Sequence, residues 1–222
     1  MNQPYDLRPA FTFLNDLKRN NSKPWFDAHR HDYEESRRNV EVFVSSFIEA
    51  LRPIDDVGPL SARESLMRIN RDVRFSRDKS PYRTNVGAEI APGGRRGGRF
   101  GYFIHLEPGG GSLLGGGMYM PLPEQLAKFR QAIAQDADTF RRIVRRRGFV
   151  KEFGAIEGER LATAPQGYPR THPEIDLLRL KQVLAAHHFP DAEVLSPDFL
   201  QQTVAAAKEL KPLNDWLNSH LL

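Results

Sequence analysis

The stretch MRINRDVRFSRDKSPYRTN, residues 67–85, decides how the middle of the chain is interpreted. Apolar side chains recur along it two or four positions apart, at Met67, Ile69, Val73 and Phe75. The positions between them carry polar side chains, at Arg68, Asn70, Asp72 and Arg74. This period of two predicts a β-strand with one apolar face and one polar face. Arg71 is the exception, because strict alternation places its guanidinium on the apolar face, where a cation needs a partner.

The next residues, 76–82, predict a loop at the end of this strand, with Pro81 fixing its path. Arginine suits bidentate recognition of phosphate or carboxylate, and lysine supplies a movable charge. We therefore expect a site for an anionic small molecule, in which cations hold the ligand, carboxylates orient them or act as a general base, and a phenol donates a hydrogen bond. The cations are Arg71, Arg74 and Lys79, the carboxylates are Asp72 and Asp78, and the phenol is Tyr82.

Two other interpretations of this stretch remain open. Asp72 and Asp78 could pair with the neighbouring arginines in a structural ion-pair network. Exposed pairs contribute only about 0–1 kcal/mol each, so a purely structural role gives little reason to concentrate so many charges. The stretch could also belong to the interface of a non-catalytic interaction protein.

The net positive charge of the chain is concentrated in the same stretch. The formal net charge is +4, and residues 68–83 hold six cations against two anions, which leaves the rest of the chain neutral. Other basic clusters comprise Arg95, Arg96 and Arg99 and the arginines of residues 141–147. Together with the stretch they suggest a sequence-tolerant nucleic-acid binder as the alternative function, although residues 141–147 also fit a solvated helix face.

Helices are predicted on both sides of the stretch. Apolar residues three and four positions apart indicate a helix over residues 40–51, and Phe11, Leu14 and Leu17 indicate another before it. Helical spacing returns beyond Pro121, and two final helices are predicted at residues 197–210 and 212–221.

Further strands are predicted at residues 85–91, 100–106 and 112–120, with short elements around residues 177–180 and 183–187. The connectors between the strands are rich in glycine and too short for helical crossovers, which favours an antiparallel meander. The expected fold class is α+β, as a single domain over residues 1–222. Its central antiparallel sheet packs against the N-terminal and C-terminal helices, and its other face is partly open.

Four blocks of sequence resemble a known family. They read FLNDLKRNNSKPWF, NRDVRFSRDKSPYRTN, GGGSLLGGGMYMP and GYPRTHPEIDLLRLK, and they extend over nearly the whole chain in the family's order. By these blocks the chain resembles the bacterial and fungal family called domain of unknown function 2461. The resemblance implies one full-length domain and supplies no catalytic role. Its signature positions are Trp25, Arg71, Asp72, Arg74, Phe75, Asp78, Lys79, Pro81 and Tyr82, and its one departure is Arg83, where lysine is expected.

Other motifs carry weaker candidates. Ser76 and Lys79 match the S-x-x-K spacing of a lysine-activated serine, but the strand before them favours a turn. The glycine runs spell no phosphate-binding loop, so turns and close backbone packing are the expected use, although residues 115–117 could admit a ligand. His105 is a candidate catalytic residue because its predicted strand could place it beside the polar row. Trp25 is a candidate pocket wall or stacking platform.

The chain contains no cysteine, which excludes disulfides, thiolate metal sites and a cysteine nucleophile. Its seven histidines show no metal-binding spacing, so we expect no zinc site, and no cofactor is indicated. A metal held by carboxylates alone would leave no such signature. The first residues lack a basic segment followed by an apolar run, and no apolar stretch approaches the roughly 18 residues of a membrane span. We expect a cytoplasmic protein with no membrane partner.

Overall fold

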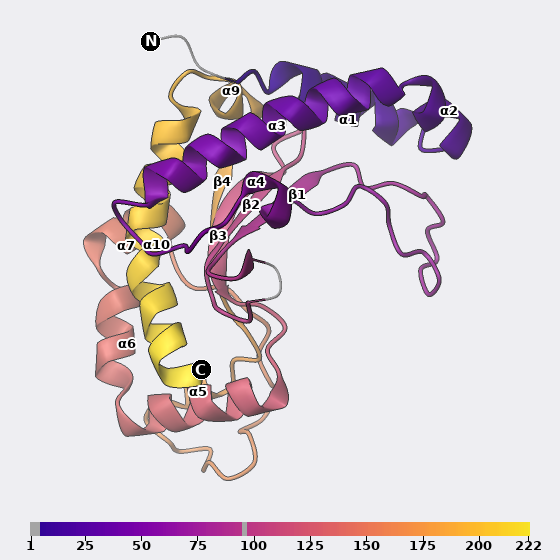
Figure 1. The fold of residues 1–222 in the computed structure, drawn as a ribbon. Helices are drawn as coiled ribbons and strands as arrows, with labels where there is room; N and C mark the ends of the chain where they lie inside the picture. Colours follow the sequence, from indigo (N-terminus) through magenta and orange to yellow (C-terminus); the bar gives the residue numbers. More distant parts are fainter. Residues whose placement is uncertain (1–4, 95–96) are drawn as a thin grey trace. The chain divides into compact units, whose positions relative to one another are not determined.

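A computed structural model describes residues 5–94 and 97–222. Within these residues, four strands form one antiparallel sheet in the order β1-β2-β3-β4 (Figure 1). The strands are β1 (Val86–Ile90), β2 (Tyr102–Leu106), β3 (Ser112–Met118) and β4 (Val183–Phe189). The first three coincide with strands predicted from the alternating pattern, and the fourth with the short element expected around residues 183–187. The α+β fold class with an antiparallel sheet is confirmed.

Helices precede and follow the first three strands, as the spacing of apolar residues predicted. Those before the sheet are α1 (Arg8–Arg19), α2 (Lys23–Ala28), α3 (Arg30–Leu51) and α4 (Ala62–Ser65). Those after β3 are α5 (Pro123–Gln135), α6 (Ala137–Val144), α7 (Arg147–Phe153), α8 (Ile175–Leu178), α9 (Asp191–Val194) and α10 (Phe199–Leu221).

The prediction of two final helices is wrong, because α10 continues through Pro212. Proline normally ends or kinks a helix by removing a donor and crowding the preceding turn. Leu210 and Leu213, on either side of Pro212, are completely buried. Their burial holds this segment helical where the local preference of proline would end it.

The chain divides into two compact units, each assembled from several segments. One unit comprises Met1–Gly97, Phe103–Leu114 and His188–Ala205. The other comprises Gly98–Tyr102, Gly115–His187 and Ala206–Leu222.

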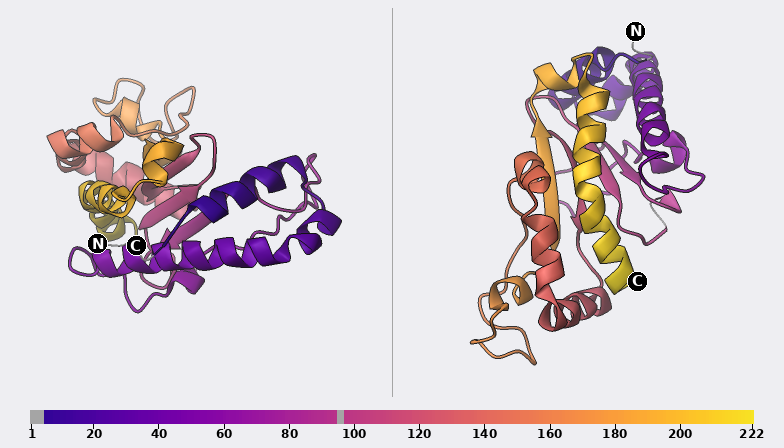
Figure 2. Two further views of the ribbon diagram at one scale, coloured as in Figure 1. Left: turned by 90° about the horizontal axis from the view of Figure 1, so that it is seen from above. Right: turned by 90° about the vertical axis from the view of Figure 1, so that its left-hand side faces the viewer.

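In the first unit, α1 and α3 run in opposite directions, and the short helix α2 connects them at one end (Figure 2). The apolar face of α3 buries Val40, Phe43 and Phe47, which explains its regular spacing in the sequence. Ser36 on α3 donates a hydrogen bond from its hydroxyl to the carbonyl oxygen of Pro9 on α1, at 3.1 Å. The two helices are therefore joined by a polar contact as well as by apolar packing.

The second unit has an aromatic core. The Trp216 ring of α10 meets the Phe140 ring of α6 and the Phe129 ring of α5 edge to face, with centroids 4.9 and 6.1 Å apart. Edge-to-face contacts between aromatic rings are favourable beyond the area that they bury. This cluster fastens the final helix to the helices that follow β3.

Strand β2 shows how the sheet separates a core face from an open face. Tyr102, Ile104 and Leu106 are buried, while Phe103 and His105 on the opposite face are half-buried. The partly open second face was predicted from the sequence.

The strand predicted over residues 67–75 is wrong. Residues 66–88 form an irregular antiparallel hairpin, which we call the hairpin segment, with isolated bridges at Leu66–Ala88 and Asn70–Tyr82. Between these bridges one arm advances four residues and the other six, so the register changes and no continuous ladder forms. The predicted polar side chains are exposed and Ile69 is buried, but Phe75, predicted on the apolar face, lies in solvent.

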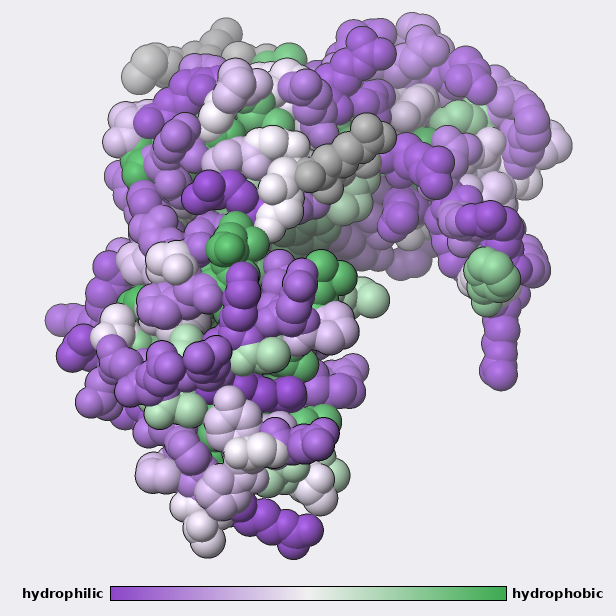
Figure 3. All heavy atoms as spheres, turned by 60° about the horizontal axis from the view of Figure 1, so that its bottom comes forward, coloured by the Kyte–Doolittle hydropathy of each residue, from purple (hydrophilic) through white to green (hydrophobic). Residues whose placement is uncertain are grey.

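Large apolar side chains are exposed at scattered points of the described surface. Figure 3 shows one mostly hydrophilic face on which apolar residues form small separate groups. Among the described residues, no helix is long and apolar enough to cross a membrane.

Candidate functional site

Arg71, the cation that interrupts the alternation, is bound inside the hairpin segment. Its guanidinium donates to the carboxylate of Asp78, to the carbonyl oxygen of Ser80 at 3.1 Å, and to the hydroxyl of Ser76 at 3.4 Å. Only about a quarter of the Arg71 side chain is exposed. The partner that a half-buried cation requires is therefore Asp78, seven residues further along the chain, and Arg71 ties the loop together.

Asp78 is held in its charged form by the same loop. Its carboxylate accepts hydrogen bonds from the hydroxyl of Ser80 at 2.6 Å and from the backbone N–H of Ser80 at 2.9 Å. The pKa of Asp78 is lowered to about 2. The two bonds from Ser80 are the largest causes of this shift, and the bond from Arg71 is the next largest. A carboxylate with so low a pKa is a weak base at neutral pH.

Arg74 and Asp72 form a second, exposed pair. The Nε and Nη2 atoms of Arg74 donate to the two carboxylate oxygens of Asp72 at 2.9 and 2.6 Å, and these bonds lower the pKa of Asp72. Lys79 donates from Nζ to the carbonyl oxygen of Val73 at 3.0 Å. Each of the three predicted anion-holding cations thus has a partner in its own segment, and two of those partners are carboxylates.

Tyr82 anchors the hairpin segment to the helices. Its buried ring stacks on Phe26 of α2, with centroids 4.1 Å apart and planes 15° from parallel. Asn21 bonds both backbone groups of Tyr82, donating to its carbonyl at 2.9 Å and accepting from its N–H at 3.1 Å. Trp25, at the rim of the same apolar cluster, stacks on His29 with centroids 4.0 Å apart. Both aromatic residues therefore have packing roles.

His105 lies on the open face of β2. Its Nε2 atom is 2.9 Å from a carboxylate oxygen of Glu107, and its ring is 6.1 Å from that of Phe103. About a fifth of its side chain is exposed. In the described part of the chain, no group of three or more His, Asp or Glu side chains could hold a metal ion.

A hollow that is open to solvent lies between the base of the hairpin segment and helices α1 and α3. Phe13 and Leu14 of α1 and Val40 of α3 give it an apolar wall. Tyr33 and Arg37 of α3 also line it, and Arg37 is paired with Glu41 at 2.9 Å. The hollow and all its lining residues belong to the first unit.

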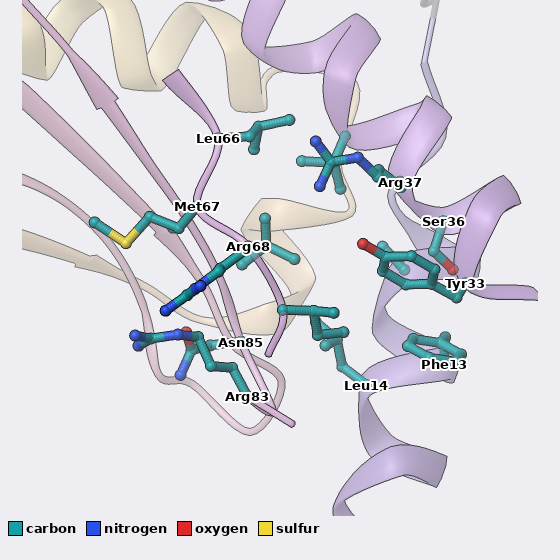
Figure 4. Close-up of a pocket in the computed structure, with 15 residues that line it drawn as sticks. Phe13, Leu14, Tyr33, Ser36, Arg37, Leu66, Met67, Arg68, Arg83 and Asn85 are labelled. Atoms are coloured by element: carbon teal, nitrogen blue, oxygen red, sulfur yellow. The ribbon is translucent and has the colours of Figure 1, made fainter. Parts of the chain in front are cut away.

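Two cations of the hairpin segment gather at the rim of this hollow. Arg68 and Arg83 come from opposite arms and reach the same side of the segment, beside Asn85 and away from Phe13 (Figure 4). Neither guanidinium has an ion pair or side-chain hydrogen bond to any other residue within 5–94 or 97–222. The charge of Arg68 helps to lower the pKa of Asp72, but that carboxylate accepts its hydrogen bonds from Arg74.

Two adjacent guanidinium groups that lack carboxylate partners can bind phosphate or carboxylate in bidentate fashion. The amide of Asn85 adds a neutral donor and acceptor. We call Arg68, Arg83 and Asn85 the rim cluster. Arg68 belonged to the predicted polar row, whereas Asn85 was not foreseen as a site residue, and Arg83 was counted among the cations of the stretch and noted as a departure from the family. Arg83 and Asn85 are two residues apart, a spacing typical of one strand face, and this was the signal that could have linked them.

The other basic clusters are in part paired with carboxylates and in part outside the described residues. Arg141 binds Glu174 and lies 3.1 Å from Asp176, and Arg146 lies 2.6 Å from Glu209. Arg95 and Arg96 lie outside the described residues. Carboxylates thus neutralise part of the basic charge of residues 141–147.

Comparison with known proteins identifies a family without a described activity. The family model described as conserved hypothetical protein (DUF2461) matches residues 9–216. No curated protein and no solved structure matches the chain.

Proposed function

Since the chain belongs to the DUF2461 family of conserved hypothetical proteins, whose description states no activity, we propose a function from the chemistry of its site. The protein binds a phosphorylated or carboxylated small molecule in the hollow beside the hairpin segment. Arg68 and Arg83 hold the anionic group, and Asn85 adds a hydrogen bond.

The observation that carries this proposal is the unmatched charge of the rim cluster. Arg71 and Arg74 have carboxylate partners, whereas Arg68 and Arg83 have none in the described residues. Two neighbouring like charges repel each other, so an anion that bridges them is favoured. The hollow beside them combines an apolar lining with a few convergent polar groups, which is the character of a small-molecule site.

The hydrogen bonds described above favour a structural role for Arg71 and Asp78. Asp72 and Asp78 have lowered pKa values and are occupied by arginine or serine donors, which makes them poor general bases at neutral pH. We therefore propose binding and assign no reaction. We also propose that the protein acts in the cytoplasm, which is consistent with the absence of cysteine.

Ligand-induced thermal stabilisation tests this function. The full chain would be heated with inorganic phosphate, pyrophosphate, sugar phosphates, nucleotides and citrate in turn. A ligand at 100 times its Kd should stabilise the folded protein by about 2.7 kcal/mol. We expect the stabilisation to disappear in the Arg68→Gln/Arg83→Gln double variant.

The matched control is Arg74→Gln, which removes an arginine of the same segment that is already paired with Asp72. This variant should keep the full ligand response. Equal loss of response in Arg74→Gln and in the double variant would show a diffuse electrostatic effect and contradict the proposed site. A double variant that responds as fully as the unmodified protein would also contradict it.

A further inference from the structure

The tip of the hairpin segment presents a single aromatic ring to solvent. Phe75 is 95% exposed, the highest value among the large hydrophobic residues of the described chain. Removing an aromatic ring from water is strongly favourable, so a ring left fully in solvent is available to a partner.

The loop that carries this ring is held by its own hydrogen bonds. The carbonyl oxygen of Val73 accepts from the N–H of Ser76 at 3.3 Å and from Nζ of Lys79 at 3.0 Å. Arg71 closes the loop from inside through Asp78 and Ser80. The backbone on both sides of Phe75 is therefore fixed, and the ring is displayed by a defined loop.

The surroundings of the ring carry excess positive charge. The guanidinium of Arg74 lies 5.8 Å from the centroid of the Phe75 ring, and its charge is balanced by Asp72. Arg77 has no carboxylate partner among the residues that the structure describes, and Lys79 bonds only a neutral carbonyl. A partner at this tip therefore needs negative charge next to a flat apolar surface.

We propose that the tip, residues 73–79, binds single-stranded nucleic acid, with a base stacked on Phe75 and phosphates contacted by Arg77 and Lys79. Every nucleotide combines a flat base with a phosphate, and stacking on an aromatic side chain tolerates any base. A paired base is stacked within its duplex and hides its faces, so an unpaired strand is the fitting partner. An anionic bilayer fits less well, because one ring and a few cations give only marginal anchoring.

This inference does not depend on the small-molecule site, because it uses neither Arg68 nor Arg83. Fluorescence anisotropy of labelled 15-nucleotide oligo-dT and oligo-rU, titrated with the full chain at 50 and 200 mM salt, tests it. We expect Phe75→Ala to weaken binding about ten-fold, and Phe75→Trp to retain it. Arg77→Gln should reduce the steepness of the salt dependence by about one released counterion.

Leu195→Ala is the matched control, because Leu195 is another exposed apolar side chain outside the hairpin segment. It should leave the affinity for both oligonucleotides unchanged. Equal affinity of Phe75→Ala and the unmodified chain would overturn the proposal, and so would a duplex of the same length that binds as tightly as the single strand. Phe75-dependent binding to vesicles with phosphatidylserine, without binding to either oligonucleotide, would assign the tip to a membrane instead.

Discussion

At the scale of single residues, Arg71 and Arg68 show how position decides the use of a cation. Arg71 points toward the inside of its loop, where a charge without a partner is costly, and it is matched by Asp78. Arg68 is exposed at the rim of the hollow, where water solvates its charge and a carboxylate partner is not required. The interior position is therefore used for folding, and the exposed position is open to a ligand.

The carboxylate of Asp78 makes a prediction about acid stability. Its pKa is about 2 in the folded protein, against an ordinary value of 3.8 for an aspartate carboxyl. A lowered pKa stabilises the folded state fully above the unfolded value, and this contribution is lost as the pH falls from about 4 through about 2. We expect the difference in Tm between the unmodified protein and Asp78→Asn to be constant from pH 7 to pH 5 and to shrink below pH 4.

Thermal unfolding across this pH range measures the effect, and carboxyl NMR titration measures the pKa directly. The hydroxyl of Ser80 is the largest cause of the lowered pKa. Ser80→Ala should therefore raise the pKa of Asp78 in the folded protein, so that the loss of stability in acid is smaller and is complete at a higher pH. Titration of Asp78 near its ordinary value in the unmodified protein would show that the loop bonds do not form in solution.

At the scale of secondary structure, the sequence was most informative where one local pattern determined an element. The three-and-four spacing of α3 and the alternation of β2 were read correctly, because each buries one regular face. The hairpin segment was misread because its register changes between two bridges, and pairing between distant residues leaves no local signal. For the same reason the partner of Arg71 was not identified, although Asp78 had been named as a candidate.

The glycine run of β3 supports a prediction about close packing, the use that the sequence favoured over a phosphate loop. Gly117 has a φ of +108°, and a Cβ atom there would collide with the carbonyl oxygen of Val183 in β4. Gly117→Ala should therefore reduce the free energy of unfolding by more than about 2 kcal/mol. The new methyl group adds backbone strain and also a steric overlap with the carbonyl oxygen of Val183.

The matched control for Gly117 is Gly167, which also has a positive φ, of +87°, but has open space where its Cβ would lie. Gly167→Ala should cost only the conformational strain, about 1–2 kcal/mol. Urea unfolding of the two variants compares these effects. Equal destabilisation would mean that the contact between the β3 and β4 backbones is not restrictive.

At the scale of the whole molecule, the effect of net charge on anion binding can be measured separately from the effect of local charge density. The net charge is +4, and residues 68–83 alone carry that excess. Replacing Arg68, Arg77, Lys79 and Arg83 by glutamine gives a neutral chain without the basic segment. An equally neutral control replaces four exposed and dispersed arginines, at Arg38, Arg63, Arg160 and Arg170.

Retention on a heparin column at pH 7 compares these two neutral variants. Clustered cations produce a stronger local electrostatic potential than the same number of dispersed cations. At 0.1 M salt, charges more than about 10 Å apart are largely screened from each other, so dispersed cations do not add up to the same potential. We therefore expect the hairpin variant to elute at markedly lower salt than the control, which should remain close to the unmodified protein. Similar elution of the two variants would mean that heparin senses only the net charge, and that the hairpin segment has no anion-binding surface of its own.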